Sequence, residues 1–403
     1  ITQPGWLTRT FNGDSVIWAL VVVFMIYSLL AVYSSSVSVA YLRHGGNTTY
    51  FLRSQFIILA LSLGIILIVH YLPYRIYYRL SGLLLLFSIG LLALTFVIGD
   101  RINDAVRAIY IPGVGRIQSS DIAKLALVIY LARVLGQFKD KLTDFMLVTR
   151  YMMIPVAVVC GLIMPENLST AVMVFGISMI IMFIGRVPIR FLLAYVGMAI
   201  VGIAIMAGVL MLVSDDNRVK TWERRIQSHF SSKVDDDSNY QSNQAKIAIS
   251  TGGLFGKAPG GSTQRNMLPQ SNSDFIFAII IEEYGLLFGA LPLILAYMVL
   301  LFRGITIVRK CDAAFPAYLV IGLVVMITVQ AMINMMVAVG LFPVTGQTLP
   351  MVSWGRTSAL VMSFSIGAIL SVSRVVNARI RKEELPEEEK TDEGERIYEP
   401  AGA

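Results

Sequence analysis

A single carboxylate, Asp274, stands where a polar, glycine-rich segment meets an apolar run, within the stretch Tyr240–Gly289. Two further carboxylates, Glu282 and Glu283, lie inside that run. If the run is one helix entering a bilayer, Glu282 lies about 12 Å deeper than Asp274, at about 1.5 Å per residue. A carboxylate at such depth is costly and marks a functional site by default. We interpret Asp274 as a candidate general base at the outer membrane surface. The structural alternative, a helix cap formed by Ser273 or Asp274, is compatible with that role.

Lys124 is a candidate partner for these acids. It follows Asp121 by three residues near the start of another apolar run, so the two side chains share a helix face. We expect Lys124 to pair with Glu283 or to contact an anionic phosphate, in preference to extending toward the lipid surface. Glu282 and Glu283 point about 100° apart on a helix, so at least one of them faces the bundle interior. A structural ion pair is the role that we favour for the two glutamates.

Other polar groups adjoin the apolar runs. Glu166, in the turn 164–168, either caps the next helix or lines the same outer cavity. The segment Gly252–Lys257 has the wrong spacing for a Walker phosphate loop, and no strand precedes it. Its glycine-rich backbone near Lys257 either approaches a diphosphate or forms a plain flexible loop. The loop 340–358, with its glycines and prolines, predicts a re-entrant or surface-lining turn, and Asn334 faces inward just before it.

Composition places all of these residues in a membrane. The chain has 403 residues, of which 56% are hydrophobic and 15% charged, which excludes disorder and argues against a soluble globule. The net charge is +7, but the basic residues are scattered between apolar runs, which indicates membrane topology and no nucleic-acid partner. Two cysteines and three histidines predict neither a disulfide framework nor a histidine metal cluster. The acidic trio Asp235–Asp237 either binds a divalent cation or forms a solvated loop face, and we favour the latter.

Near-continuous apolar runs predict an all-α polytopic membrane protein, because only helices or closed barrels satisfy backbone groups in lipid. Ten runs approach the length of about 20 residues that crosses a bilayer, and the fourth and fifth are the weakest. The ten runs are 15–36, 51–72, 77–98, 120–136, 150–165, 168–185, 189–213, 275–302, 314–339 and 355–377.

Lysine and arginine in the short loops predict that both termini are cytoplasmic. The large loop 214–274 between the seventh and eighth helices is then extracytoplasmic. The first apolar run has no obvious signal-peptide cleavage site after it, so we expect it to be a retained anchor. We expect one ten-helix domain over 1–380. The remaining 381–403 is acidic and poor in apolar residues, which predicts a disordered cytoplasmic tail.

Four motifs together resemble the SEDS family, the bacterial shape, elongation, division and sporulation proteins. Gln118–Lys124 (QSSDIAK) is similar to the family's Q-P-S-E-x-x-K, and Pro165–Ala171 (PENLSTA) to its Q-P-D-L-G-T-A. Leu268–Gly285 matches L-P-x-x-x-x-D-F-I-F-x-x-x-x-E-E-x-G. Asn334–Ser358 matches N-x-x-x-x-x-G-x-x-P-x-T-G-x-x-L-P-x-x-S-x-G-G-[ST]-S, except that Arg356 replaces the second glycine. The resemblance covers nearly the whole chain.

The resemblance implies a peptidoglycan glycosyltransferase that polymerises lipid II, with Asp274 at the position of the family's essential aspartate. One base is enough to take a proton from the acceptor sugar, because undecaprenyl diphosphate leaves as a stable anion, and a single displacement inverts the anomeric centre. That anion needs cations: Lys124, Lys257, Arg107 or a divalent ion such as Mg²⁺ or Mn²⁺. Other motif residues are candidates for substrate contact (Gln118, Ser353 and Thr357) or for polar and ion-pair support (Asp121, Glu166, Glu282, Glu283 and Asn334).

Within the family, the first span and the long loop favour the division member over the elongation member. The resemblance also implies a class B penicillin-binding protein, a transpeptidase, as partner, together with other divisome membrane proteins, and a location in the bacterial inner membrane. Two other functions remain open: a flippase or transporter of the lipid-linked precursor, and a non-catalytic scaffold of the division machinery.

Overall fold

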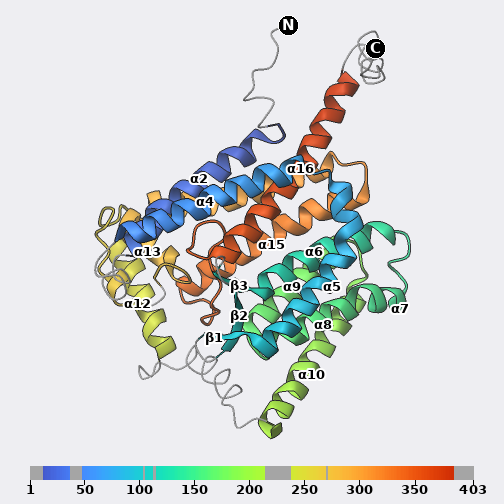
Figure 1. The fold of residues 1–403 in the computed structure, drawn as a ribbon, viewed down its shortest axis with the longest axis horizontal. Coiled ribbons are helices and arrows are strands. Elements are labelled where there is room, and N and C mark those ends of the chain that lie inside the picture. The colour runs from blue at the N-terminus through green and yellow to red at the C-terminus, as the bar shows by residue number, and fades with distance from the viewer. Residues whose placement is uncertain are drawn as a thin grey trace.

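The computed structural model describes residues 12–36, 48–102, 105–111, 115–213, 237–268 and 271–384. Its long helices form one bundle (Figure 1). The first half contains α2 (Ser15–Ser35), α4 (Thr48–Tyr71), α5 (Tyr74–Ile98), α6 (Ser119–Gln137), α7 (Phe145–Val148), α8 (Ile154–Ile163), α9 (Leu168–Ile184) and α10 (Ile189–Val213). The second half contains α12 (Asp237–Gly252), α13 (Ile276–Gly285), α14 (Leu291–Arg309), α15 (Ala314–Ala338) and α16 (Arg356–Glu384).

Each of the ten expected runs forms helix, and eight helical stretches among the described residues are long and apolar enough to cross a membrane. The fifth run is one of the eight, because α7 and α8 join through a π-helical turn, Thr149–Met153, into the stretch Phe145–Ile163. The two remaining runs form α9, which is apolar but has only 17 residues, and α6, which carries three charged residues, Asp121, Lys124 and Arg133. The chain is therefore a multi-pass membrane protein.

The expectation of an all-α chain is wrong in one segment. Between α5 and α6, strands β1 (Asp100–Ile102), β2 (Ala105–Ile111) and β3 (Gly115–Gln118) form an antiparallel sheet in the order β1-β2-β3. Ile109 lies opposite Ile117 in the β2–β3 pair. The β-branched and aromatic residues of the strands favour this pairing. The pairing satisfies the backbone groups of a segment that is too polar to continue the helix.

The helices α15 and α16 form the middle of the bundle. In the most apolar stretch of each helix, 72% of the residues of α15 and 78% of those of α16 are buried, against 11% for α10 at the periphery. Figure 1 shows them between the pair α2–α4 and the group α5, α6 and α9, with α12 and the three strands at one end. The loop that joins α15 to α16 lies at that end too, so it meets several other segments there. At the opposite end α16 runs to Glu384, a few residues beyond the domain boundary expected at 380.

The eighth run is not one uninterrupted helix. Gly285, with φ of 75°, ends α13, and the π-helical segment η3 (Leu286–Ala290) leads into α14. The amides of Leu286 and Leu287 donate to the carbonyls of Gly253 and Leu254 at 3.0 and 3.1 Å. A loop that follows α12 therefore satisfies the backbone groups that the helix break leaves open.

Candidate active site

Asp274 lies in the turn 271–275 just before α13, and its side chain is partly buried. Three consecutive carbonyls of this turn accept hydrogen bonds from α15 and from the loop that follows it. The donors are the Trp354 amide to Asn272 at 2.9 Å, the Ser353 hydroxyl to Ser273 at 2.7 Å and the Asn334 side-chain amide to Asp274 at 2.8 Å. The backbone that carries Asp274 is therefore fixed from a distant part of the chain.

The capping role expected for Ser273 or Asp274 is not the one observed. The N-cap of α13 is Phe275, whose side chain makes no capping bond. Phe275 is fully buried, so packing of its ring sets where the helix begins. The carboxylate of Asp274 sits one residue ahead of the cap position.

Asn334 and Gln347 extend this network to a second motif. Asn334 also donates to the Gln347 carbonyl at 2.7 Å, and the Gln347 side-chain amide donates to the Thr170 hydroxyl at 2.7 Å. Thr170 in turn donates its backbone amide to the Asn167 side chain at 3.1 Å. The segments around Asp274, Asn334 and Asn167 thus form one connected polar network. Sequence reasoning did not single out Gln347 or Thr170, although both lie inside the quoted motifs.

The ion pair expected between Lys124 and Glu283 does not form, and Lys124 is not open to a ligand. Its amine lies 3.1 Å from Asp121 and also donates to the Gln330 side chain. Lys124 is 1% exposed, so the ion pair is a structural element of the interior. Gln330 donates onward to the Thr348 carbonyl at 3.0 Å, which ties this pair to the α15–α16 loop as well.

Glu282 and Glu283 belong to a separate cluster at the α12–α13 junction. Glu282, which is fully buried, accepts bonds from the Lys257 amine at 2.7 Å and from the amide and hydroxyl of Thr263 at 3.1 and 3.0 Å. The hydroxyl of Ser262 also donates to it. Lys257 is therefore a partner of Glu282, and the phosphate-binding role considered for it is not supported by this geometry.

Glu283 contacts different groups on the same side of α13. The hydroxyl of Ser34 on α2 donates to it, and the guanidinium of Arg265 lies 3.8 Å away. The two glutamates thus form ion pairs, and their partners are Lys257 and Arg265. Both pairings bind the segment 253–268 to α13.

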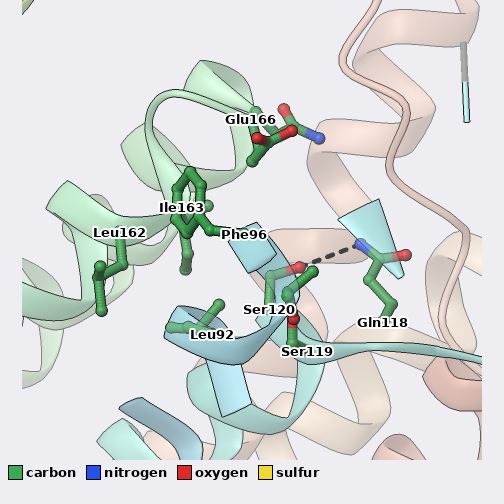
Figure 2. Close-up of a pocket in the computed structure, with 10 residues that line it drawn as sticks. Leu92, Phe96, Gln118, Ser119, Ser120, Leu162, Ile163 and Glu166 are labelled. Atoms are coloured by element: carbon green, nitrogen blue, oxygen red, sulfur yellow. Dashed lines mark hydrogen bonds between the residues drawn. The ribbon is translucent and has the colours of Figure 1, made fainter. Parts of the chain in front are cut away.

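A pocket opens beside the first two motifs, with about 350 Å³ of empty space that is partly open to solvent (Figure 2). Gln118, Ser120 and Glu166 contribute polar groups to it, and the apolar Leu162 and Ile163 line the other side (Figure 2). Glu166 thus lines a pocket, but Asp274 is not among the residues that line it. Leu92, Thr95, Phe96, Ser119 and Asn167 complete the lining.

Hydrogen bonds connect the pocket wall to the start of α16. The Gln118 amide donates to the Thr357 hydroxyl at 3.2 Å, and that hydroxyl donates to the Arg116 carbonyl at 3.1 Å. Gln118 uses its side-chain amide for Ser120, at 3.1 Å. Thr357 and Ser353 therefore hold backbone segments together, whatever contact they make with a substrate.

Some of the expected site residues cannot be placed. The side chain of Arg107, on β2, and the acids Asp235 and Asp236 lie outside the described residues, as does the tail beyond Glu384. Within the described part of the chain, no three His, Cys, Asp or Glu side chains gather as a metal site.

The similarity to known proteins extends over nearly the whole chain. The model of the family FTSW_RODA_SPOVE, described as "Cell cycle protein", matches residues 14–378. A probable peptidoglycan glycosyltransferase FtsW of Saccharophagus degradans is 32% identical over 375 residues, 90% of this chain and 93% of that protein. The stage V sporulation protein E of Bacillus subtilis is 29% identical over 374 residues, 91% of this chain and 98% of that protein.

Solved structures share the fold. The crystal structure of the rod shape determining protein RodA of Thermus thermophilus superposes with a TM-score of 0.64 at 25% identity, covering 92% of this chain and 98% of that one. A chain from a peptidoglycan synthase complex that coordinates polymerization and crosslinking gives a TM-score of 0.69 at 23% identity, with coverages of 90% and 98%.

Proposed function

Because the chain belongs to the FTSW_RODA_SPOVE family of cell cycle proteins, we propose that it is a peptidoglycan glycosyltransferase that polymerises lipid II into glycan strands. The relatives named as probable peptidoglycan glycosyltransferases support the enzyme class. We propose the septal, division role, which the FtsW names of these relatives favour. The elongation role of a RodA-type polymerase is the alternative.

The single observation that carries the proposal is the way in which Asp274 is held. Its carboxylate is partly exposed, while three successive carbonyls of its turn are bound by residues of α15 and the following loop. A general base must be held in one position yet reach its substrate, and this arrangement meets both needs. Asp121, Glu282 and Glu283 form buried ion pairs, and Glu166 lies along the pocket wall.

In the proposed reaction, Asp274 accepts the proton of the acceptor's sugar hydroxyl. The hydroxyl oxygen attacks the anomeric carbon of the donor, and the bond from that carbon to the diphosphate oxygen breaks. The electron pair leaves with undecaprenyl diphosphate, so no second carboxylic acid is needed to protonate the leaving group. One displacement inverts the anomeric configuration.

We also propose the surroundings in which the enzyme acts. Ten membrane spans with both termini in the cytoplasm place the segment 214–274, and with it Asp274, on the outer side of the inner membrane. A class B penicillin-binding protein is the proposed transpeptidase partner, and other divisome membrane proteins join it. A protein of the same fold is part of a peptidoglycan synthase complex, which supports such a partnership.

The test uses purified protein with lipid II, with and without a class B penicillin-binding protein, and measures glycan strands. Asp274→Ala and Asp274→Asn should each lower the rate by about 10²- to 10⁴-fold, the usual contribution of a general base. Asp140→Asn is the matched control, because Asp140 is an exposed carboxylate between α6 and α7.

The variants must keep the wild-type melting temperature for the comparison to count. A folded Asp274→Ala protein that still polymerises lipid II would remove Asp274 as the base. A wild-type protein that makes no glycan with its partner present, but moves lipid II between leaflets, would support the transporter function instead.

A further inference from the structure

Arg356 is an exposed arginine at the first residue of α16, in the position where the related motif has glycine. The backbone on both sides of it is held in place. Ser353 and Trp354 bond to the turn of Asp274, and Thr357 bonds to β3 through the Arg116 carbonyl. Within the described residues, the guanidinium itself has no hydrogen-bond or ion-pair partner. A cation whose backbone is fixed in this way is preorganised to bind an anionic group from outside the protein.

Three cations in or near the motifs already face carboxylates. Lys124 is paired with Asp121, and Lys257 with Glu282, at 3.1 and 2.7 Å. Arg265, at 3.8 Å from Glu283, faces a carboxylate as well. A diphosphate that leaves near Asp274 therefore needs a cation other than these three.

Two short pieces of backbone and one hydrogen bond connect Arg356 to Asp274. The Trp354 amide donates to the Asn272 carbonyl at 2.9 Å. Arg356 follows Trp354 by two residues and Asp274 follows Asn272 by two, and each interval spans at most about 7.6 Å, at 3.80 Å per Cα step. The long arginine side chain is exposed at this point.

We propose that Arg356 binds the diphosphate of the lipid-linked donor, a proposal that rests on the proposed glycosyltransferase function. The planar guanidinium donates two parallel hydrogen bonds to phosphate oxygens. While Asp274 takes the hydroxyl proton, the electron pair of the breaking carbon–oxygen bond passes to the diphosphate, whose negative charge then grows beside Arg356. The arginine thus lowers the energy of the bound donor and, more strongly, of the transition state.

The phosphate of an ordinary anionic phospholipid offers the same chemistry to a guanidinium. The test must therefore separate a diphosphate donor from a bilayer headgroup. Farnesyl diphosphate serves as a soluble probe for the donor's leaving group, and phosphatidylglycerol in detergent micelles serves as the probe for the headgroup.

The experiment compares wild type with Arg356→Gln, Arg356→Lys and Arg356→Gly, and uses Arg381→Gln as control because Arg381 is exposed in the last turn of the same helix. Calorimetric titration with farnesyl diphosphate should show about tenfold weaker binding for Arg356→Gln and Arg356→Gly, the usual worth of one charge-assisted contact. Arg356→Lys should retain part of the affinity, since it keeps the charge and loses the bidentate geometry. Arg381→Gln should bind like wild type.

The kinetic arm uses lipid II, where Arg356→Gln should lower kcat/KM by about tenfold or more. Equal farnesyl diphosphate affinity in wild type and Arg356→Gln would overturn the inference, even if glycan synthesis is normal. Phosphatidylglycerol that competes with farnesyl diphosphate at equal concentration would overturn it too, because it would assign the site to bilayer headgroups. Loss of diphosphate binding in Arg356→Gln, with no glycan made by wild type, would uphold the binding site and reject the proposed function instead.

Discussion

The carboxylate of Asp274 and the amine of Lys124 show two different uses of an ionisable side chain in one motif set. Asp274 is partly exposed, with its backbone held by three hydrogen bonds. Lys124 is buried, and Asp121 and Gln330 take up its donors. The first arrangement suits a group that exchanges a proton with a substrate, and the second suits a group that holds helices together.

Replacing Lys124 should therefore affect folding first. Lys124→Ala leaves Asp121 as an uncompensated buried charge, so we expect a loss of about 3–5 kcal/mol in stability, with activity falling as the protein unfolds. Thermal unfolding in detergent, followed alongside glycan synthesis, measures both effects. Lys139→Ala, at an exposed lysine after α6, should change stability by less than about 0.5 kcal/mol. If Lys124→Ala keeps the wild-type melting temperature but loses activity, the result would favour phosphate binding by Lys124 over a structural role.

The element that most changes the picture of the site is the interrupted helix α13–η3–α14. The loop 253–257 lies against the break so closely that a Cβ on Gly285 would meet the Leu254 carbonyl at 2.3 Å. The Lys257 amide donates to the Glu282 carbonyl at 2.9 Å, just before the break. Backbone contacts and the buried Glu282 therefore fix this loop, which the sequence left open as a flexible segment.

Gly285→Ala tests the closeness of this packing. The substitution places a Cβ against a carbonyl and strains a residue whose φ is 75°, so it should cost about 1–3 kcal/mol or more. Hydrogen exchange of the segment 253–268 should rise with it, because the loop loses its contact. The control is Gly161→Ala in α8, where a new Cβ meets nothing within 4 Å. That helical substitution should be neutral or stabilising by about 0.5–1 kcal/mol. Equal behaviour of the two variants would contradict the packing argument.

At the scale of the whole molecule, the bundle gathers the polar chemistry at one end. The three strands, α12 and the α15–α16 loop lie there, and Figure 1 shows the C-terminal end of α16 at the other end. The four motifs come from segments as distant as Gln118 and Thr357, which are hydrogen-bonded. The proposed topology makes this end extracytoplasmic.

Single cysteines test that topology. Cysteine at Gly260, in the loop after α12, should react with a membrane-impermeant maleimide in intact cells, and cysteine at Asp140, after α6, only after permeabilisation. Cys160 and Cys311 are first changed to serine. Cys311 would add little background in any case, because burial raises the pKa of its thiol to about 11 and keeps it protonated at neutral pH. Labelling of both sites in intact cells, or of neither, would reject the proposed arrangement.

The sequence by itself determined the helical membrane architecture and the candidate residues. Long apolar runs have one main solution in lipid, so all ten became helices, and an acid at the edge of such a run marks Asp274 without any knowledge of its neighbours. Intramembrane glutamates also imply cationic partners on general grounds, because a buried charge must be compensated.

Only the tertiary structure decided which groups meet. Lys124 contacts Asp121 and Gln330, while Glu282 pairs with Lys257 and Glu283 with Arg265. Sequence spacing orders contacts within one helix, but contacts between helices depend on how the bundle packs, and several cations can satisfy the same carboxylate equally well in principle. The start of α13 at Phe275, the break at Gly285 and the strands after α5 have the same origin. In each case, packing and hydrogen bonds from a distant segment outweigh the local preference of the residues involved.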